Sequence, residues 1–308
     1  MKSVYLKILF GLGFISLLAS QAMATSIDMK GSYIYTQISD DGTLGNHYLY
    51  PGIVYDSSGT GSFSSSSPDF LRPGAPFETF SVKSDQTGTL INRNDSSDNI
   101  FGTLTDLSAS SPYDFYIRWS GSYETYFDIV TYTYFNNDDS YIMFTTTITA
   151  KEDLTNLKFL RTIDPDQDAI PYHIYRTNNN RGYGSILPEN FVYASGPKSN
   201  LTIGLYSNSY YTHNTGVSDP WSRDPDDYLS GNNDGSGDYT IGIAFLLGNL
   251  DAGESATFDY AYILGKNPDD AVSHIPTGGA PVPEPGTFML LGTGLIGLAG
   301  LGRIKRKK

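Results

Sequence analysis

The chain has 308 residues, contains no cysteine and carries a formal net charge of −13 at pH 7. Without cysteine the chain forms no disulfide, thiolate zinc site or iron–sulfur cluster, and it has no cysteine nucleophile. The acidic balance also argues against nucleic-acid binding, which needs clustered positive charge to displace counterions.

The first 24 residues have the three-part layout of a secretory signal peptide. Lys2 and Lys7 give a positive start, and residues 8–18 form an apolar run. Ala22 and Ala24 then supply the small-x-small pattern that signal peptidase reads. An N-terminal membrane anchor is the alternative, but the apolar run is too short for it. The pattern therefore predicts a signal peptide over residues 1–24, with cleavage after Ala24.

Residues 25–277 are dominated by strand patterns and predict one β-sandwich domain. Aromatic and β-branched residues alternate with polar ones over residues 123–135, and a polar turn leads to a hairpin partner at residues 141–150. Many short strands with polar turns, no convincing helix and no βαβ alternation favour an all-β fold, a large antiparallel β-sandwich. Two smaller sandwiches are the alternative, but no internal linker is as clear as the one after residue 277. Further strands are expected at residues 32–38, 48–55, 77–82, 115–119, 157–163, 190–194, 201–206, 240–246 and 255–264.

The sharpest candidate for a binding site is the acidic run Asp164, Asp166 and Asp168. Three carboxylates at alternate positions converge on one hard cation if the chain makes a tight loop, and Pro165 favours such a loop. Ca²⁺ takes about six to eight oxygen ligands at about 2.3–2.6 Å. The alternative is an acidic loop that bonds to Arg161 and to backbone amides. The pattern therefore suggests the hypothesis that Asp164, Asp166 and Asp168 bind calcium.

Two further patterns are weaker indications of binding. Asn232, Asp234 and Ser236 imitate the start of an EF-hand loop, but Ile243 stands where the bidentate glutamate belongs, so a hairpin loop is favoured. Exposed aromatic side chains can stack on sugar rings, although tyrosine also suits half-buried strand positions. Aromatic clusters are expected at Tyr113, Tyr116, Trp119, Tyr123 and Tyr126, and at Tyr210, Tyr211 and Trp221. No serine lies in a Gly-x-Ser-x-Gly elbow, and no catalytic residue is predicted.

The C-terminal segment has the pattern of a linker followed by a short membrane helix. Residues 278–287 are rich in glycine and proline, and residues 288–301 are apolar or small throughout. A basic stop follows, formed by Arg303, Lys305, Arg306, Lys307 and Lys308. The positive-inside rule keeps these charges in the cytoplasm. A comfortable span needs about 20 apolar residues, so residues 288–308 predict a short, temporary transmembrane helix with a basic tail.

Pro283, Glu284 and Pro285 stand in the linker, and the order of this motif, a short helix and a basic cluster resembles the PEP-CTERM sorting signal. The resemblance covers residues 282–308. It implies a secreted protein of a Gram-negative cell, whose Pro-Glu-Pro motif is recognised by exosortase, a transpeptidase-like membrane enzyme. It also implies that the helix is removed after export. An ordinary C-terminal membrane tail is the alternative.

The two basic ends conceal how acidic the exported part of the chain is. Lys2 and Lys7 belong to the signal peptide, and the tail holds five basic residues and Glu284. Without these segments the remaining 257 residues hold 13 basic and 32 acidic side chains, a net charge of −19. Such a charge favours solubility and attracts cations outside the cell.

These features together predict an exported, noncatalytic β-sandwich protein of the cell surface or extracellular matrix. Its expected route leads transiently through the inner membrane to the envelope surface or the medium, with exosortase as its partner during sorting. Adhesion or association with exopolysaccharide in a biofilm is the expected role. Two alternatives stay open: a calcium-assisted glycan-binding module, and a carbohydrate-active enzyme on a large sandwich fold.

Overall fold

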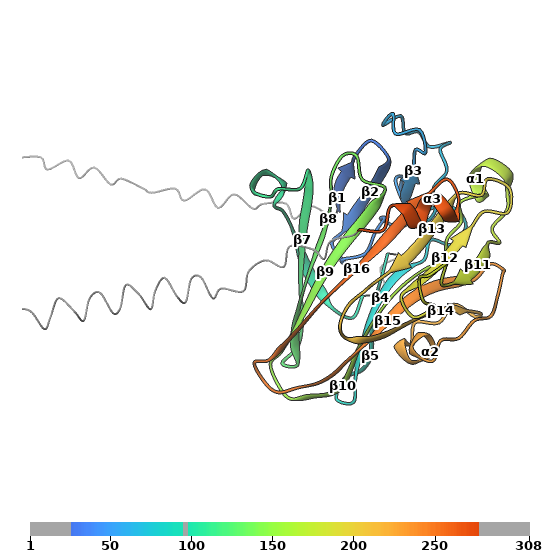
Figure 1. Cartoon of the computed structure of the whole chain (residues 1–308). Coiled ribbons are helices and arrows are strands. Elements are labelled where there is room, and N and C mark those ends of the chain that lie inside the picture. Colours follow the sequence, from blue (N-terminus) through green and yellow to red (C-terminus); the bar gives the residue numbers. More distant parts are fainter. Residues whose placement is uncertain (1–25, 95–97, 277–308) are drawn as a thin grey trace, which may run out of the picture.

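The computed structural model describes residues 26–94 and 98–276 (Figure 1). Within these residues the strands form antiparallel sheets that do not close into a barrel, and the all-β, antiparallel prediction is confirmed. The predicted signal peptide (residues 1–24) and the predicted linker and tail (residues 278–308) lie outside the described residues. Among the helices of the described part, none has the length and apolar character needed to cross a bilayer.

The described strands are arranged in a small sheet and two larger ones. The small sheet has the order β1 (Ser26–Lys30), β2 (Ile34–Ser39) and β3 (Ile53–Tyr55). The second sheet has the order β14 (Thr212–Ser218), β15 (Thr240–Leu250), β10 (Leu154–Ile163), β4 (Glu78–Ser84) and β5 (Gly88–Arg93). The third has the order β11 (Asn178–Arg181), β12 (Phe191–Ser195), β13 (Thr202–Tyr206), β16 (Ser255–Gly265), β9 (Tyr141–Ala150), β8 (Phe127–Phe135), β7 (Phe115–Tyr123) and β6 (Phe101–Asp106). Short helices lie between them: η1 (Ser108–Ser110), α1 (Ala169–Tyr172), α2 (Pro225–Leu229) and α3 (Pro268–Ser273).

The hairpin of β8 and β9 illustrates how the sequence forms these strands. Along β8, Phe127 and Ile129 are buried while Asp128 between them is exposed, as the two-residue period of a strand requires. β8 then pairs with β9 in antiparallel register, which confirms the predicted hairpin. The turn between them is closed by Asp139, whose Oδ2 accepts a hydrogen bond from the backbone N–H of Asn136 (2.7 Å).

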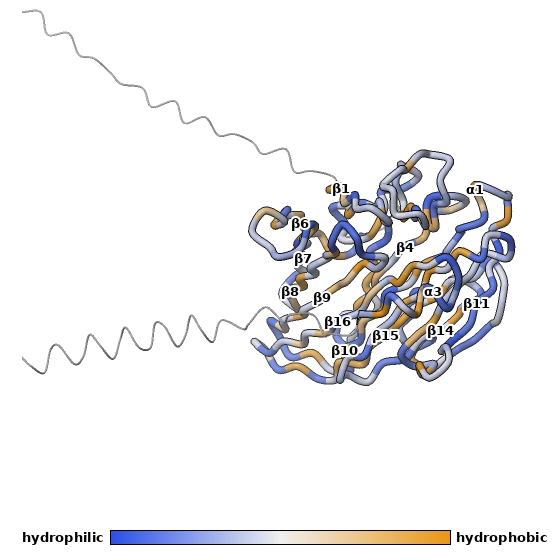
Figure 2. The backbone as a smooth tube through the Cα atoms, turned by 45° about the horizontal axis from the view of Figure 1, so that its top comes forward, coloured by the Kyte–Doolittle hydropathy of each residue, from blue (hydrophilic) through white to orange (hydrophobic). Residues whose placement is uncertain are grey.

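Aromatic side chains from the two larger sheets meet in the core of the sandwich. The ring of Phe258 on β16 lies 5.0 Å from that of Phe159 on β10 and 4.7 Å from that of Phe245 on β15, centroid to centroid. All three side chains are buried, and burying one phenylalanine stabilises the fold by about 1.5–3 kcal/mol. Figure 2 shows the same division along the chain, with hydrophobic residues on the central strands and hydrophilic residues in the loops.

A buried ion pair joins β10 and β4, two neighbouring strands of the five-stranded sheet. The Arg161 guanidinium donates to both oxygens of Glu78, and the bond from Nη2 to Oε2 measures 2.8 Å. Glu78 also accepts hydrogen bonds of 2.8 Å from the Leu44 N–H and the Tyr262 hydroxyl. The guanidinium lies 4.8 Å from the ring centroid of Phe144. Arg161 is thus buried in the core and paired with Glu78. The hypothesis that the acidic loop bonds to Arg161 was therefore wrong.

Short α-helices occur within the described residues, although the sequence predicted none. In α2, Pro225 occupies the first turn, and the Asp224 side chain caps the helix by accepting a hydrogen bond from the Asp226 N–H (3.0 Å). The helix packs its buried Tyr228 against the outer face of the five-stranded sheet. Five residues are too few to show an apolar period, so only the cap signals this helix in the sequence.

Candidate functional site

The end of β10 carries the predicted acidic run and lies between two other strands. Ile163 pairs with Glu78 of β4 on one side and with Ile241 of β15 on the other. Asp164 follows directly, and its backbone N–H donates a hydrogen bond to the Phe77 carbonyl (2.9 Å). Because these neighbouring strands are antiparallel, the residues just before β4 and just before β15 lie beside the residues just after β10.

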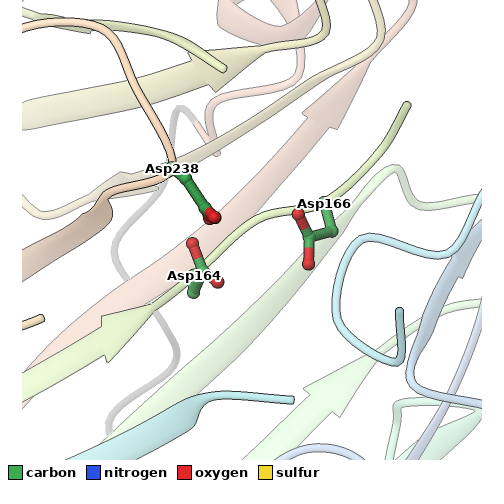
Figure 3. Close-up of side chains that lie close together, drawn as sticks. All are labelled: Asp164, Asp166 and Asp238. Atoms are coloured by element: carbon green, nitrogen blue, oxygen red, sulfur yellow. The ribbon is translucent and has the colours of Figure 1, made fainter. Parts of the chain in front are cut away.

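Three carboxylates meet at this edge of the sheet: Asp164, Asp166 and Asp238, here called the acidic trio. One side-chain oxygen of each lies within 4.8 Å of the others. In Figure 3, Asp164 and Asp238 point toward each other and Asp166 lies beside them. Asp164 and Asp166 are each 2% exposed, whereas Asp238 is exposed to solvent. The acidic trio therefore has a buried floor and one open side.

The buried members of the trio lack the partners that buried carboxylates normally have. The Oδ1 atoms of Asp164 and Asp166 are out of contact with solvent and accept no hydrogen bond. Among the described residues, the ion pairs of lysine and arginine involve other acids. Burying an unpaired ionised carboxylate is costly, so such a group takes up a proton or binds a cation.

The electrostatics of the trio reflect this burial. Burial raises the pKa of Asp164 to about 8, and the charge of Asp238 adds to the effect. Burial also raises the pKa of Asp166 to about 9, with smaller contributions from Asp164 and Asp238. Desolvation raises the pKa of Asp238 as well. All three groups therefore attract positive charge, whether it comes as a proton or as a metal ion.

The donor set fits a hard cation. The trio offers only carboxylate oxygens, which Ca²⁺ prefers, and none of the thiolate or imidazole ligands typical of zinc. Water can complete the coordination from the open side at Asp238. Gly74 packs closely against the floor: its φ is +71°, and a Cβ there would come within 3.0 Å of the Asp166 Oδ2 atom. Only glycine suits this position, because a side chain would be strained and would press on the carboxylate.

Asp168 does not join the trio, so the three aspartates predicted from the sequence do not converge. Its side chain is buried and faces the turn between β12 and β13. There the Asp168 carboxylate accepts hydrogen bonds from the backbone N–H groups of Lys198 (2.7 Å) and Ser199 (3.2 Å). The chain turns into α1 at Asp168, which directs this side chain away from Asp166. The hypothesis of a loop bonded to backbone amides thus describes Asp168 alone.

Asp238 takes the third place in the trio, and the sequence analysis missed it. It stands two residues before β15, whose partner β10 ends just before Asp164. Both strands were expected from the sequence, but alternation of side chains does not reveal which strands pair. The usable signal was one aspartate two residues before β15 and two aspartates within three residues after β10.

An open pocket of about 400 Å³ lies next to the trio. Its lining consists of Phe77, Arg93, Asp219, Pro220, Trp221 and Arg223. The rings of Phe77 and Trp221 meet edge to face, with centroids 5.3 Å apart. The Arg93 guanidinium lies 4.9 Å from the Phe77 ring centroid. The pocket therefore joins two aromatic rings to two arginines at an exposed edge of the sandwich.

Each aromatic wall of this pocket is bonded to a residue of the acidic trio. The Trp221 indole Nε1–H donates a hydrogen bond to the backbone carbonyl of Asp238 (2.9 Å). On the other wall, the carbonyl of Phe77 accepts from the backbone N–H of Asp164 (2.9 Å). The trio residues are thus hydrogen-bonded to the indole ring of Trp221 and to the backbone that carries the Phe77 ring.

The loop that carries Trp221 is tied to the sheet by ion pairs. Lys83 contacts Asp224 and Asp226 (2.7 Å each), and Lys158 also contacts Asp226 (2.5 Å). Asp234, in the segment that imitates an EF-hand, accepts a hydrogen bond from the backbone N–H of Asp219 (2.7 Å). This segment is therefore part of a bonded loop, in line with the hairpin-loop interpretation.

The structure keeps only parts of the aromatic clusters expected from the sequence: Tyr113 stacks on Tyr116, and Tyr123 stacks on Tyr126. Trp119 is buried and does not offer its ring to a ligand. Tyr210 and Tyr211 stack on each other (centroids 4.3 Å apart) just before β14, whereas Trp221 follows the opposite end of that strand. The grouping of Trp221 with these tyrosines was wrong, since its ring partner is Phe77.

The C-terminal segment matches a known protein-sorting motif. The family described as the PEP-CTERM protein-sorting motif matches residues 281–307. The chain is a PEP-CTERM domain-containing protein. The match includes Pro283, Glu284 and Pro285 and most of the basic stop. It supports export through the membrane to the cell surface, with processing by exosortase.

This PEP-CTERM protein matches no curated protein by sequence. Among solved structures it is similar to a bacterial glucoamylase complexed with acarbose, at a TM-score of 0.50 and 9% identity, over 82% of this chain and 33% of that one. An α-mannosidase from Enterococcus faecalis V583 follows at a TM-score of 0.41 and 13% identity, over 82% and 31%. A putative aldose 1-epimerase from Escherichia coli K12 has a TM-score of 0.38 and 10% identity, over 78% and 98%. The PEP-CTERM protein spans about a third of the glucoamylase chain, and at this identity the likeness concerns the fold alone.

Proposed function

We propose that this PEP-CTERM protein is a noncatalytic, exported carbohydrate-binding protein that serves adhesion or association with exopolysaccharide. The observation that carries the proposal is the pocket in which Phe77 and Trp221 stand beside Arg93 and Arg223. Export supports the same role, because the pocket then faces the polymers outside the cell.

The chemistry of the pocket suits a sugar. Aromatic rings pack against the apolar face of a sugar ring, and an indole or guanidinium N–H donates to hydroxyl or carboxylate oxygens at its edge. Arginine holds its donors in a planar fork, which favours directed bonds to such groups. The pocket volume of about 400 Å³ lies within the range of about 300–1,000 Å³ typical of small-molecule sites. A short stretch of a polysaccharide is the ligand that this combination fits best.

The spacing and burial of the nearby carboxylates support carbohydrate binding without cleavage. Glycoside hydrolysis uses two carboxyl groups about 5–9.5 Å apart, on opposite sides of the bond that breaks. The oxygens of the acidic trio lie within 4.8 Å of one another, and two of the three groups are buried. A sugar ring does not fit between them. Asp219 is the one carboxylate in the pocket lining among the described residues.

Replacing Trp221 by alanine should weaken carbohydrate binding about tenfold or more, because stacking and the buried area of the ring are lost. The measurement is the dissociation constant of the mature protein on a panel of neutral and uronate-containing polysaccharides, including the polymer of the producing cells. Tyr210→Ala is the matched control, because Tyr210 is 83% exposed and lies away from the pocket. We expect this control to bind as the wild type does.

Two results would contradict the proposal. One is an absence of binding to every polysaccharide, or equal binding by the Trp221→Ala and wild-type proteins. The other is a release of reducing sugar from a bound polymer by the wild-type protein, which would favour the carbohydrate-active enzyme instead.

A further inference from the structure

We propose that Asp164, Asp166 and Asp238 bind one calcium ion and that this ion fixes the two aromatic walls of the pocket. The first half of the inference stands on the trio alone. The second half rests on the proposed carbohydrate-binding function, since it names the ion as the element that prepares the pocket.

The case for an ion begins with the two buried carboxylates. Asp164 and Asp166 are almost wholly withdrawn from solvent, and an oxygen of each has no hydrogen-bond partner. Buried polar groups are nearly always paired, so unpaired groups in a native fold indicate a missing partner. Asp238 brings a third carboxylate within 4.8 Å of these two. A divalent cation among the three oxygens would pair all of them at once.

Calcium is the cation that this arrangement favours. Ca²⁺ accepts flexible oxygen coordination that is completed by water, whereas Mg²⁺ demands near-ideal octahedral geometry and releases its water reluctantly. The exposed side of Asp238 gives water this access. Calcium sites of extracellular modules have dissociation constants of about 10⁻⁴–10⁻³ M, and the net charge of −19 on the exported part draws cations toward the domain. The site is therefore suited to filling after export.

The ion would act on the pocket through two backbone hydrogen bonds. Asp238 holds the Trp221 indole through its carbonyl, and Asp164 holds Phe77 through its N–H, each at 2.9 Å. Without the ion, the carboxylates of Asp164 and Asp238 repel each other unless they are protonated. With the ion, both residues are drawn to one centre, which fixes the Trp221 indole and the backbone that carries the Phe77 ring.

Terbium is a suitable probe for this site, because it replaces calcium at oxygen ligands and emits when a nearby indole is excited. We expect the mature protein, purified from cells that export it, to show terbium emission that calcium displaces. Calcium at tenfold its dissociation constant should also raise the melting temperature by about 3–5 °C. Trp221→Phe should lose most of the emission and keep the melting shift, because the trio stays intact.

Asp166→Asn and Asp238→Asn should lose both the calcium-displaced emission and the melting shift. Asp238 is exposed, so its variant tests the site even if the change at buried Asp166 impairs folding. Asp251→Asn is the matched control, because Asp251 is exposed and follows the opposite end of β15. No calcium effect in the wild type, or equal effects in the wild type and both trio variants, would overturn the metal site.

Carbohydrate binding measured with calcium and with EDTA separates this inference from the proposed function. Binding that weakens at least tenfold in EDTA and in Asp238→Asn supports the coupling. Binding that is unchanged in EDTA overturns the coupling and leaves the carbohydrate-binding function in place. Intact calcium binding without any carbohydrate binding overturns that function and the coupling, while the metal site remains.

Discussion

Replacing Arg161 by methionine should lower the free energy of unfolding by about 3–5 kcal/mol, because it leaves Glu78 buried without its cation. Both side chains are at most 1% exposed, so water does not replace the lost partner. A typical domain is stable by only about 5–15 kcal/mol, and this single change would consume a large share of that margin. Urea denaturation of the mature protein measures the loss.

The double variant Glu78→Gln with Arg161→Met provides the control for this prediction. Glutamine carries no charge: its one oxygen can accept from the Leu44 N–H, and its amide N–H can donate to the Tyr262 hydroxyl oxygen. We expect the double variant to be more stable than Arg161→Met alone, because it leaves no unpaired charge buried in the core. A loss below about 1 kcal/mol in the single variant would show that the pair does not organise the core.

Deleting residues 282–308 should change where the protein ends up and leave its domain folded. Without the apolar segment and its basic stop, nothing halts the chain in the membrane and exosortase has no motif to recognise. We expect the truncated protein to leave the envelope fraction and appear as soluble protein beyond the inner membrane. Cell fractionation measures this, and the urea midpoint of the purified protein should not change.

Alanine at Pro283, Glu284 and Pro285 tests the sorting motif apart from the membrane segment. This variant keeps the apolar segment and the basic stop, so we expect it to stay membrane-bound and unprocessed. Unchanged envelope retention after the full deletion would refute the sorting role of the tail.

The strands of this protein were largely predictable from its sequence, whereas the way they pair was not. The alternation of apolar and polar residues along β8 and the turn at Asn136 predicted the hairpin of β8 and β9, because both signals are local. The pairing of β10 with β15 joins segments far apart in the chain, and side-chain alternation carries no information on partners. For this reason Asp164 and Asp166 were found and Asp238 was missed.

The same limit explains the aromatic pocket and the role of Asp168. Phe77 and Trp221 come together because β4 and the loop before α2 meet beside β10, a contact that only the tertiary structure creates. Asp168 looked equivalent to its neighbours in the sequence, but α1 begins directly after it and turns its carboxylate toward backbone amides. The spacing of the three aspartates predicted that their carboxylates converge, but the helix α1 turns the Asp168 side chain away from the other two.

Charge contacts hold a loop of this chain, which has no cysteine to form a disulfide. The ion pairs of Lys83 and Lys158 with Asp226 fasten the loop that carries α2 to the sheet. At the end of the loop, Trp221 bonds to Asp238, and there the trio has no cation among the described side chains. A calcium ion at the trio would complete the series of charge contacts along this edge.

Equilibrium dialysis of the mature protein against radioactive calcium, over the micromolar to millimolar range, tests the central claim most directly. We expect saturable binding of one ion per chain, with a midpoint of about 10⁻⁴–10⁻³ M, and its loss in Asp238→Asn but not in Asp251→Asn. An absence of saturable binding in the wild type, or the same stoichiometry in Asp238→Asn, would contradict it.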